Sequence, residues 1–462
     1  MPRYDVAVIG SGPGGYVAAV RAARLGLKVC VVEQGELGGT CLQVGCIPTK
    51  AMIRSAEVFH LATHASDFGV QAADVSVDWP ALMARKDKVV GLLTRGVGGL
   101  FKKHGIDVAA GRGRLTAPDR IEVTAADGEG SEVAADHIIV ATGSAPAAVP
   151  AFPFDGTHIL SSDEVTRLDR CPSSILVVGG GYIGCEFACF FAELGVKVTV
   201  VEMLDHLLTN MDADLARFAL RTLKKAKVDV RLGTQVTAIE ASEVGVTATF
   251  EKGDPVEAEV ALVSVGRRCL SDDLGLAEVG VEVDDRGSVV IDDACRTSVP
   301  TIYAIGDVTG KMALAHVASR QGVIAAEAVA GQAHARIDYG KIPAAVFLHP
   351  ELATVGMTEA DARAAHEHVK VVSCPQQILG RDQAEGDPGG FIKIVADEST
   401  GEILGVHIAG HRASDLIHEA ALAMTSELLV DDFAMAVHAH PTFSEGFLEA
   451  AELWLDRAIH VG

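Results

Sequence analysis

Two cysteines separated by four residues are the side chains whose type and spacing best suit redox chemistry. Cys41 and Cys46 lie in the segment GGTCLQVGC, residues 38–46. This spacing brings two sulfurs within bonding distance if the segment forms a distorted helical turn. Exchange with a disulfide needs a thiolate, and a helix N-terminus or a nearby cation lowers the pKa of a thiol. The spacing alone also fits two free buried cysteines or a metal site, although no Cys/His cluster with zinc spacing lies nearby.

A second reactive group lies near the C-terminus, in the segment HAHPTFSE of residues 438–445. A dithiol must lose protons before it attacks a disulfide. A histidine accepts a proton near neutral pH, and a carboxylate orients the imidazole and stabilises its cation. His440 and Glu445 suit these two roles. A structural role is the alternative, because Thr442 and Glu445 also match a capping box at the start of the last helix.

Two glycine-rich turns recur at an offset of 169 residues, each between an apolar run and a helical stretch. Such turns let the backbone approach a pyrophosphate at a helix N-terminus, and an acid after the next strand binds ribose hydroxyls. The acid follows the last glycine by 18 residues in both copies. The predicted cofactor-binding residues of the two copies are Gly10, Gly12, Gly15 and Glu33, and Gly179, Gly181, Gly184 and Glu202. Turns without any ligand are the alternative.

The acid of the second copy indicates which pyridine nucleotide binds there. A carboxylate at Glu202 repels the 2′-phosphate of NADP, and residues 203–206 (MLDH) supply no arginine or lysine to hold it. The sequence therefore favours NAD.

The repeat also predicts the domain organisation. Residues 138–143 (IIVATG) resemble residues 261–266 (ALVSVG) at an offset of only 123, so the first copy holds 46 extra residues. These include both cysteines and amphipathic helical segments near 50–64 and 80–103. Further along, β-like runs precede helical stretches at 415–428, 431–437 and 443–456. We expect an α/β protein with two Rossmann-like dinucleotide-binding domains and a separate α+β domain at the C-terminus.

Composition excludes several classes of protein. The 462 residues suffice for about three domains. A net charge of −23 makes nucleic acid an unsuitable partner, and no apolar run is long enough for a membrane span. An apolar strand starting at residue 4 or 5 leaves no room for a targeting peptide, which favours the cytoplasm. The nine cysteines form no extracellular disulfide framework, and no metal site is expected.

The segment GGTCLQVGCIPTK, residues 38–50, resembles the active-site signature of the class I pyridine nucleotide-disulfide oxidoreductases. The resemblance covers nearly the whole chain, including both glycine turns, ATG at 141–143, YAIGD at 303–307 and the C-terminal segment. It implies that the first turn binds FAD and the second NAD. It also implies a redox disulfide in which Cys46 lies nearest the flavin and Cys41 exchanges with the substrate dithiol.

The same resemblance implies roles for other residues. Lys50 and Glu186 match residues near the flavin N5, and Asp307 matches the acid that holds the ribityl chain. Further cofactor-binding positions in the matched segments are Thr40, Thr142, Gly143, Gly266 and Gly306. His440 and Glu445 match a pair that acts across a dimer interface on the other subunit's disulfide, which makes His438 a neighbour. The His440-Pro441 peptide is expected to be cis.

The resemblance also implies domain limits. The expected domains are an FAD-binding domain with the redox disulfide at 1–148, an NAD-binding domain at 149–274, a central segment completing the FAD site at 275–342, and an interface (dimerisation) domain at 343–462.

The activity implied by the resemblance is oxidation of protein-bound dihydrolipoyl groups to lipoyl with reduction of NAD. The implied partner is the lipoyl domain of a 2-oxo acid dehydrogenase or glycine cleavage complex. The alternatives are an NAD(P)H-dependent reductase of another low-molecular-weight disulfide and a flavoprotein of complex assembly without turnover. A glutathione reductase would use NADP, and Glu202 argues against NADP. A mercuric reductase would have a cysteine pair near the C-terminus, but residues 452–462 contain no cysteine. Two departures from the family pattern are Cys269, expected to be structural, and residues 380–384, which receive no role.

Overall fold

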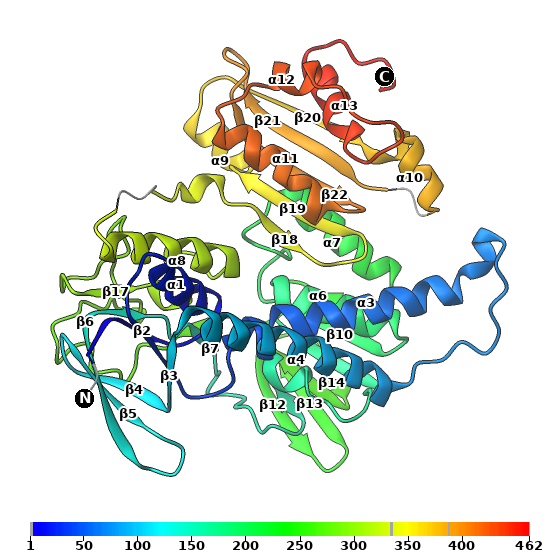
Figure 1. Ribbon diagram of the computed structural model, residues 1–462. Helices are drawn as coiled ribbons and strands as arrows, with labels where there is room; N and C mark the ends of the chain where they lie inside the picture. Colours follow the sequence, from blue (N-terminus) through cyan, green and yellow to red (C-terminus); the bar gives the residue numbers. More distant parts are fainter. Residues whose placement is uncertain (1–2, 333–335, 387–388, 462) are drawn as a thin grey trace.

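A computed structural model of the chain describes residues 3–332, 336–386 and 389–461. Its elements form three units, each built on its own sheet (Figure 1). The sheet of the second unit is parallel, that of the first is parallel except for the antiparallel strands β4 and β5, and that of the third is antiparallel. The fold is therefore the expected α/β arrangement of two dinucleotide-binding units and a C-terminal α+β unit.

The first unit is a seven-stranded sheet with the strand order β3-β2-β1-β6-β5-β4, and β17 also pairs with β6. Its elements are β1 (Arg3–Ile9), α1 (Pro13–Arg24), β2 (Val29–Glu33), α2 (Gly39–Gln43), α3 (Cys46–Thr63), η1 (Ala65–Phe68), α4 (Trp79–His104), β3 (Asp107–Ala110), β4 (Arg112–Ala117), β5 (Arg120–Thr124), β6 (Gly130–Val140), β17 (Ile302–Ala304), η2 (Gly306–Thr309) and α8 (Ala315–Val329). Helices α1 and α8 lie side by side on one face (Figure 1). Because both faces are covered, Val6, Ala7 and Val8 of β1 are all fully buried.

The second unit repeats this plan on a five-stranded parallel sheet with the order β11-β10-β9-β15-β8. Its elements are β7 (Ser144–Pro146), β8 (Ile159–Leu160), α5 (Ser162–Val165), β9 (Ser174–Val178), α6 (Tyr182–Glu193), β10 (Lys197–Val201), α7 (Ala213–Lys225), β11 (Asp229–Arg231), β12 (Val236–Ser242), β13 (Gly245–Phe250), β14 (Val256–Ala258), β15 (Val260–Val263) and β16 (Arg267–Cys269). Strands β7 and β16 pair between the first two units, and the chain then returns to the first sheet at β17. The domain limits expected from the sequence stay predictions.

The third unit is a five-stranded sheet with the order β18-β19-β22-β21-β20. Its elements are η3 (Tyr339–Lys341), β18 (Ala344–Val346), β19 (Glu351–Gly356), α9 (Glu359–Ala365), β20 (Val369–Pro375), η4 (Gln376–Ile378), α10 (Gly380–Glu385), β21 (Phe391–Asp397), β22 (Ile403–Gly410), α11 (Ala413–Thr425), α12 (Val430–Met435) and α13 (Glu445–Trp454). Helices α11 and α13 bury apolar side chains against the sheet, including Ile417 and Phe447. The three C-terminal helices lie within three residues of their expected limits.

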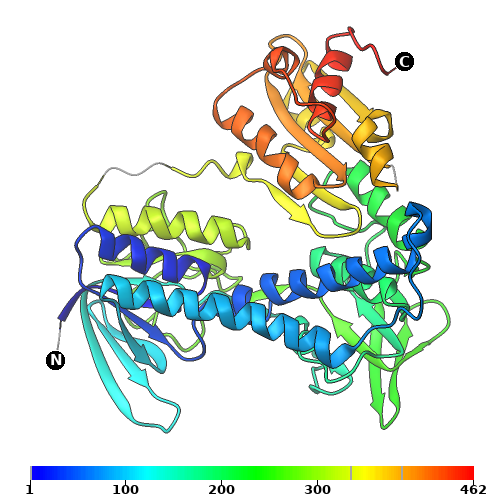
Figure 2. The same cartoon turned by 45° about the vertical axis from the view of Figure 1, so that its right-hand side comes forward.

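The long helix α3 joins the first two units. It packs along α4 and also against α6, so it reaches from the first unit to the second (Figure 2). It starts at Cys46, four residues before the helical segment expected near residue 50. The early start is sterically allowed because Pro48 lies in the first turn, where a helix needs no amide donor. Cys185 and Cys189 of α6 are buried in the hydrophobic core that α3 and α6 share.

None of the helices in the described part of the chain is long and apolar enough to cross a membrane.

Candidate active site

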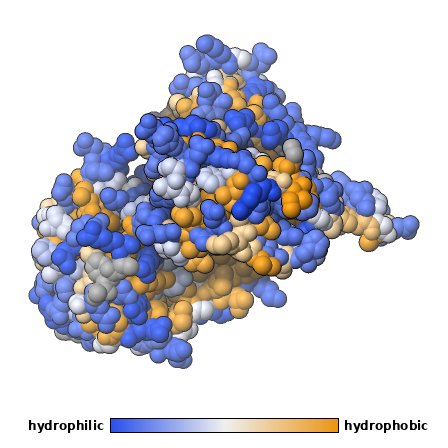
Figure 3. All heavy atoms as spheres, turned by 90° about the horizontal axis from the view of Figure 1, so that it is seen from above, coloured by the Kyte–Doolittle hydropathy of each residue, from blue (hydrophilic) through white to orange (hydrophobic). Residues whose placement is uncertain are grey.

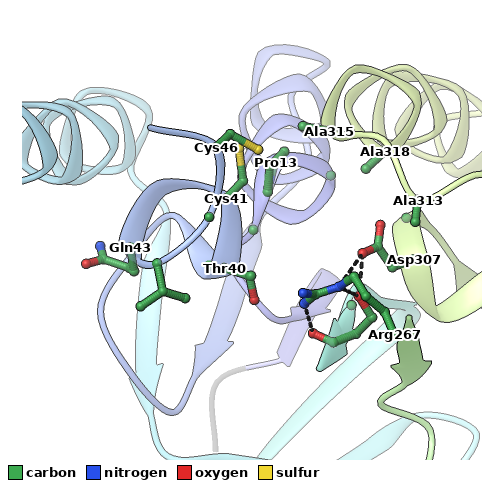
Figure 4. Close-up of a pocket in the computed structure, with 18 of the residues that line it drawn as sticks. Pro13, Thr40, Cys41, Gln43, Cys46, Arg267, Asp307, Ala313, Ala315 and Ala318 are labelled. Atoms are coloured by element: carbon green, nitrogen blue, oxygen red, sulfur yellow. Dashed lines mark hydrogen bonds and ion pairs between the residues drawn. The ribbon is translucent and has the colours of Figure 1, made fainter. Parts of the chain in front are cut away.

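The two cysteines lie on either side of a break between two helices. Cys41 belongs to α2, which ends at Gln43, and Cys46 is the first residue of α3. Figure 4 shows the two sulfurs pointing toward one another, close to Pro13 at the start of α1. Both side chains line the same cavity. The distorted helical turn expected from the spacing is therefore present, with Val44 and Gly45 at the break.

The two thiols have opposite acidities. The neighbouring Cys41 thiol and the cation of Lys50 lower the pKa of Cys46 to about 7, although burial opposes the shift. The neighbouring Cys46, with burial, raises the pKa of Cys41 far above its usual range. At neutral pH the reduced pair therefore holds its negative charge on Cys46, at the N-terminus of α3.

Lys50 lies one turn after Cys46 on α3 and forms an ion pair with α6. Its Nζ donates to Glu186 Oε2 at 2.7 Å, and the other carboxylate oxygen accepts from the Phe347 amide at 3.0 Å. The ammonium also lies over the Phe347 ring, 4.5 Å from its centroid. Glu186 is buried. Its carboxylate connects the second unit with the first through Lys50 and with the third through Phe347.

The two glycine turns match each other down to single hydrogen bonds. The amide of Ser11 donates to Glu33 Oε2 at 2.8 Å, and the amide of Gly180 donates to Glu202 Oε2 at 2.6 Å. Each acid also accepts, through Oε1, the amide two residues further on, at 2.9 Å in both copies. The sequence repeat is thus a structural repeat, and both acids are oriented toward their glycine turns.

A large cavity connects the cysteines with the first glycine turn. Its volume is about 1440 Å³, and it extends to Tyr182 and Ile183 at the start of α6. The expected site residues that line it are Gly10, Gly12, Glu33, Thr40, Cys41, Cys46, Lys50, Thr142, Gly143, Glu186, Gly306 and Asp307. Those outside the lining are Gly15, Gly179, Gly181, Gly184, Glu202, Gly266, His440 and Glu445.

Comparison with known protein families identifies the family of this chain. Residues 4–322 match the pyridine nucleotide-disulphide oxidoreductase family, and residues 342–451 match the dimerisation domain of the same family. The chain belongs to this family. It is therefore an oxidoreductase that uses FAD and NAD, and its third unit is a dimerisation domain that makes the protein a homodimer.

Relatives of similar length support this assignment. The dihydrolipoyl dehydrogenase of Halobacterium salinarum is 44% identical over 462 residues, which are 99% of this chain and 97% of the relative. Dihydrolipoyl dehydrogenase 1, mitochondrial, of Arabidopsis thaliana is 41% identical over 99% of this chain and 91% of its own. The crystal structure of LpdA from Mycobacterium tuberculosis has a TM-score of 0.92 at 31% identity and covers 98% of this chain and 99% of that chain.

The oxidoreductase provides the backbone groups that phosphates require. Helices α1 and α6 both have a glycine as the N-cap residue, Gly12 and Gly181, so no side chain caps either N-terminus. Uncapped first-turn amides and the positive end of the helix dipole bind phosphate oxygens. A Cβ on Gly181 would meet no atom within 4 Å, so this point has space for a phosphate. The residues present therefore fit a dinucleotide at each turn.

A polar cluster at the far wall of the cavity surrounds Asp307. Ser144 Oγ donates to Asp307 Oδ2, and Arg267 Nε donates to Ser144 Oγ at 2.7 Å (Figure 4). The thiol of Cys269 donates to the Asp307 carbonyl oxygen at 3.2 Å. Sequence reasoning gave no role to Ser144 or Arg267, although Ser144 directly follows the ATG segment. Cys269 was expected to be structural, and its thiol is bonded to the backbone beside the cavity.

His440 and Glu445 form the expected pair, outside their own chain's cavity. His440 Nδ1 lies 2.8 Å from Glu445 Oε1, and the other carboxylate oxygen accepts the Thr442 amide at 2.8 Å. Burial would raise the pKa of Glu445, but the Thr442 amide and the His440 ring hold it below its usual value. The His440 side chain is 76% exposed. Because a carboxylate only accepts, Nδ1 carries the proton and Nε2 remains able to take one.

Local structure around this pair departs in one respect from the capping-box alternative. Helix α13 begins at Glu445 with Ser444 as its N-cap, and the Thr442 hydroxyl instead donates to the Ala439 carbonyl. Half of the box is therefore present, through the Thr442 amide alone. The His440-Pro441 peptide is cis, as predicted.

Exposed apolar side chains surround the C-terminal helices of the dimerisation domain. The residues concerned are Leu422, Leu428, Leu429, Met435 and Val437. The view onto this side of the molecule shows apolar atoms at the surface among the hydrophilic ones (Figure 3). Val437, which lies three residues before His440, is 99% exposed. Exposed apolar side chains of this kind are consistent with the dimerisation domain identified for residues 342–451.

The glycines of the second turn allow a differential test. A Cβ on Gly184 would lie 2.0 Å from the Gly179 carbonyl oxygen, so Gly184→Ala is expected to distort the turn and lower the melting temperature. Gly181→Ala meets nothing in the protein, but it blocks the approach of a phosphate. We expect Gly181→Ala to keep wild-type thermal stability and raise KM for NAD by about tenfold or more. Unchanged KM in Gly181→Ala would show that no phosphate binds at this turn.

Proposed function

We propose that this oxidoreductase oxidises protein-bound dihydrolipoyl groups to lipoyl groups and reduces NAD, with Cys41 and Cys46 alternating between disulfide and dithiol. The observation that carries the proposal is that Cys41, Cys46 and Lys50 line one cavity together with the first glycine turn. The curated relatives named dihydrolipoyl dehydrogenase cover nearly the whole chain, which supports the choice of substrate.

The acidities of the two cysteines determine the direction of the exchange. A substrate thiolate attacks Sγ of Cys41, the Cys41–Cys46 bond breaks, and the electron pair leaves on Cys46. A thiol of lower pKa is the better leaving group, and the pKa of Cys46 is lowered to about 7. The second thiolate of the substrate then attacks the substrate sulfur that is bonded to Cys41 in the mixed disulfide, and Cys41 is released. The substrate becomes a cyclic disulfide, and the enzyme holds the reduced pair.

Two protons leave the substrate during this exchange. The released Cys41 thiolate takes one of them, because its pKa is raised far above the usual range. His440 of one protomer accepts a proton at Nε2, because Glu445 holds the Nδ1 proton and stabilises the imidazolium that forms. The exposed ring lies outside its own chain's cavity lining, so we propose that it acts on the cysteines of the partner subunit.

The remaining site residues stabilise the Cys46 thiolate or would bind the two cofactors. Lys50 stabilises the Cys46 thiolate and is itself oriented by Glu186. Asp307 and the first glycine turn would hold FAD, and the second turn with Glu202 would hold NAD. When bound, FAD would supply the two-electron chemistry that links the reduced cysteines to NAD.

A partner and a location complete the proposal. The partner is the lipoyl domain of a 2-oxo acid dehydrogenase or glycine cleavage complex, which presents the dithiol on a flexible arm. A cytoplasmic location is supported by composition, because nine cysteines, an odd number in a chain of 462 residues, do not match an extracellular disulfide framework. Three relatives are named as mitochondrial, so a mitochondrial location is the alternative.

A substrate comparison tests the proposed function. We expect the FAD-loaded dimer to reduce NAD with dihydrolipoamide, and to prefer NAD to NADP by about 10²-fold or more because Glu202 repels the 2′-phosphate. The assay follows the absorbance of the reduced nucleotide at about 340 nm. Faster reduction of glutathione disulfide by NADPH would identify a different disulfide as substrate. Normal FAD content without turnover on either substrate would favour a role in complex assembly.

A further inference from the structure

The short helix that carries Cys41 has little to stabilise it within its own residues. Helix α2 is five residues long, and its N-cap Gly38 has no side chain to offer the free amides of the first turn. Helices this short are not stable in water without contacts from the rest of the fold. Cys46, in contrast, begins the 18-residue helix α3, whose first turn is fixed by a bond from the Thr49 hydroxyl to the Gly45 carbonyl oxygen at 2.7 Å. The position of Cys41 therefore depends on contacts that α2 makes with its surroundings.

Contacts with the first unit hold both ends of α2. At its start, the Gly38 amide donates to Ser11 Oγ at 3.1 Å, which connects α2 to the first glycine turn. Near its end, Leu42 is buried in a hydrophobic core that includes Val97 of α4. The last residue of α2 is Gln43, and it adds a polar contact to the apolar one.

The amide nitrogen of Gln43 makes two hydrogen bonds that connect α2 with α4. Nε2 donates to the Leu37 carbonyl oxygen at 2.8 Å and to Thr94 Oγ1 at 2.8 Å. The Thr94 hydroxyl donates in turn to the Val90 carbonyl oxygen at 3.0 Å, so its oxygen can accept from Gln43. Because a carbonyl oxygen only accepts, the nitrogen of the amide must face Leu37. Figure 4 shows this amide pointing away from the two sulfurs, so Gln43 acts on them through the backbone of α2.

We propose that Gln43 is a positioning residue of the redox pair, which fixes α2 to α4 so that the sulfur of Cys41 stays where it can bond to that of Cys46. The proposal rests on the proposed function, because it takes the Cys41–Cys46 disulfide as the redox group. A disulfide is more stable when its two thiols are already held together, since closing the bond then costs less conformational entropy. Loss of the Gln43 bonds therefore favours the dithiol over the disulfide.

The test is the equilibrium between the Cys41–Cys46 disulfide and a dithiothreitol buffer, measured on FAD-loaded dimers under argon. Dithiothreitol gives two electrons and two protons to the disulfide and becomes a cyclic disulfide, so the ratio of its two forms sets the potential. Alkylation of the thiols and mass analysis of the peptide give the reduced fraction. Gln43→Met keeps the length of the side chain but cannot donate. We expect it to raise the equilibrium constant for reduction by about five- to tenfold, where tenfold is about 30 mV.

Thr94 provides a second variant, which keeps the test open if Gln43→Met does not fold. Thr94→Val removes the hydroxyl and leaves the bond to Leu37, so we expect a shift in the same direction of about two- to threefold. Gln43→Met/Thr94→Val is expected to match Gln43→Met within about twofold, because both substitutions act through the same bond. Fully additive shifts would contradict the anchoring of α2 to α4 by Gln43.

A glutamine with the same backbone bond elsewhere in the chain provides the control. Gln383 Nε2 donates to the Gln377 carbonyl oxygen at 2.6 Å, and the two residues are six apart, as are Gln43 and Leu37. Gln383 belongs to α10 and lies outside the cavity lining, so Gln383→Met is expected to leave the equilibrium unchanged. A lower melting temperature of Gln43→Met with an unchanged equilibrium constant would overturn the proposal, since the packing of Leu42 would then suffice to hold Cys41.

Failure of the proposed function would give a different result. A wild type that forms no Cys41–Cys46 bridge in oxidised buffer would contradict both the function and the role of Gln43. A wild type that forms the bridge but does not oxidise dihydrolipoamide would contradict only the substrate. The shift in Gln43→Met would then still support the positioning role, because the equilibrium with dithiothreitol does not depend on the substrate.

Discussion

Replacing Cys46 by serine is expected to reduce the oxidation of dihydrolipoamide by roughly 10³-fold or more, since no disulfide remains to accept electrons. Serine has nearly the size of cysteine, so FAD content and melting temperature should stay near the wild-type values. The measurement is NAD reduction under steady state, with FAD determined per chain. Cys171→Ser is a suitable control, because Cys171 is half-buried and lies outside the cavity lining. Turnover above a tenth of the wild-type rate in Cys46→Ser would contradict the redox pair.

Mixed dimers extend this prediction to the base. His440→Gln alone is expected to lower turnover by about 10² to 10⁴-fold. A dimer of one Cys46→Ser chain and one His440→Gln chain has one intact site if His440 acts on the partner subunit, and none if it acts within its own chain. We expect such dimers, purified through two different tags, to recover about half of the wild-type rate. Activity no higher than that of the parent variants would show that the base acts within one chain.

The parts of the site predicted from the sequence are those fixed by short-range geometry. The glycine turns are required locally, since a Cβ at Gly15 or Gly184 would lie 2.0 Å from a carbonyl oxygen of its own turn. The pair of His440 and Glu445 is separated by only five residues and is joined across one cis proline. Such patterns determine their geometry with little help from the rest of the fold.

Contacts between distant segments were not predicted. The amide of Phe347 binds Glu186 across 161 residues, and Arg267 reaches Ser144 across 123. Nothing in the spacing of these residues indicates the contact, because it depends on how the three units pack. The contact between His438 and Glu419 was missed for the same reason, since the resemblance identified only a neighbour of the base and Glu419 lies on a different helix.

A buried ion cluster between the second and third units is the clearest of these long-range features. Lys393 of β21 is almost completely buried, and its Nζ binds Asp212 Oδ1 at 2.8 Å, Asp214 Oδ2 at 2.6 Å and Glu359 Oε2 at 2.8 Å. Asp212 caps α7 of the second unit, and its other oxygen accepts the Glu359 amide at 3.0 Å. One lysine thus joins two units through three carboxylates.

The pH dependence of this cluster follows from its acids. Burial opposes ionisation of Asp212 and Asp214. The pKa of Asp212 is nevertheless held below its usual range by His407 and then Lys393, and that of Asp214 by Lys393. Lys393 also lowers the pKa of Glu359. Carboxylates with lowered pKa values stabilise the fold above their unfolded pKa, and this contribution is lost as pH falls through the folded values. The pKa of Lys393 is raised by its carboxylates against burial, so its contribution is lost only as pH rises through that raised value.

Lys393→Met is therefore expected to lower the free energy of unfolding by about 3 to 5 kcal/mol at pH 7, because it leaves the Asp212 carboxylate buried without a cation. Urea unfolding of the FAD-loaded dimer measures the change. The difference from wild type should shrink as the pH falls, since protonation removes the repulsion among the three acids. Lys393→Met/Asp212→Asn should recover part of the loss. Lys341→Met, which removes an exposed pair with Asp338, is the control and should cost about 0 to 1 kcal/mol. A loss as small as the control's would mean that the two units are held together by apolar packing alone.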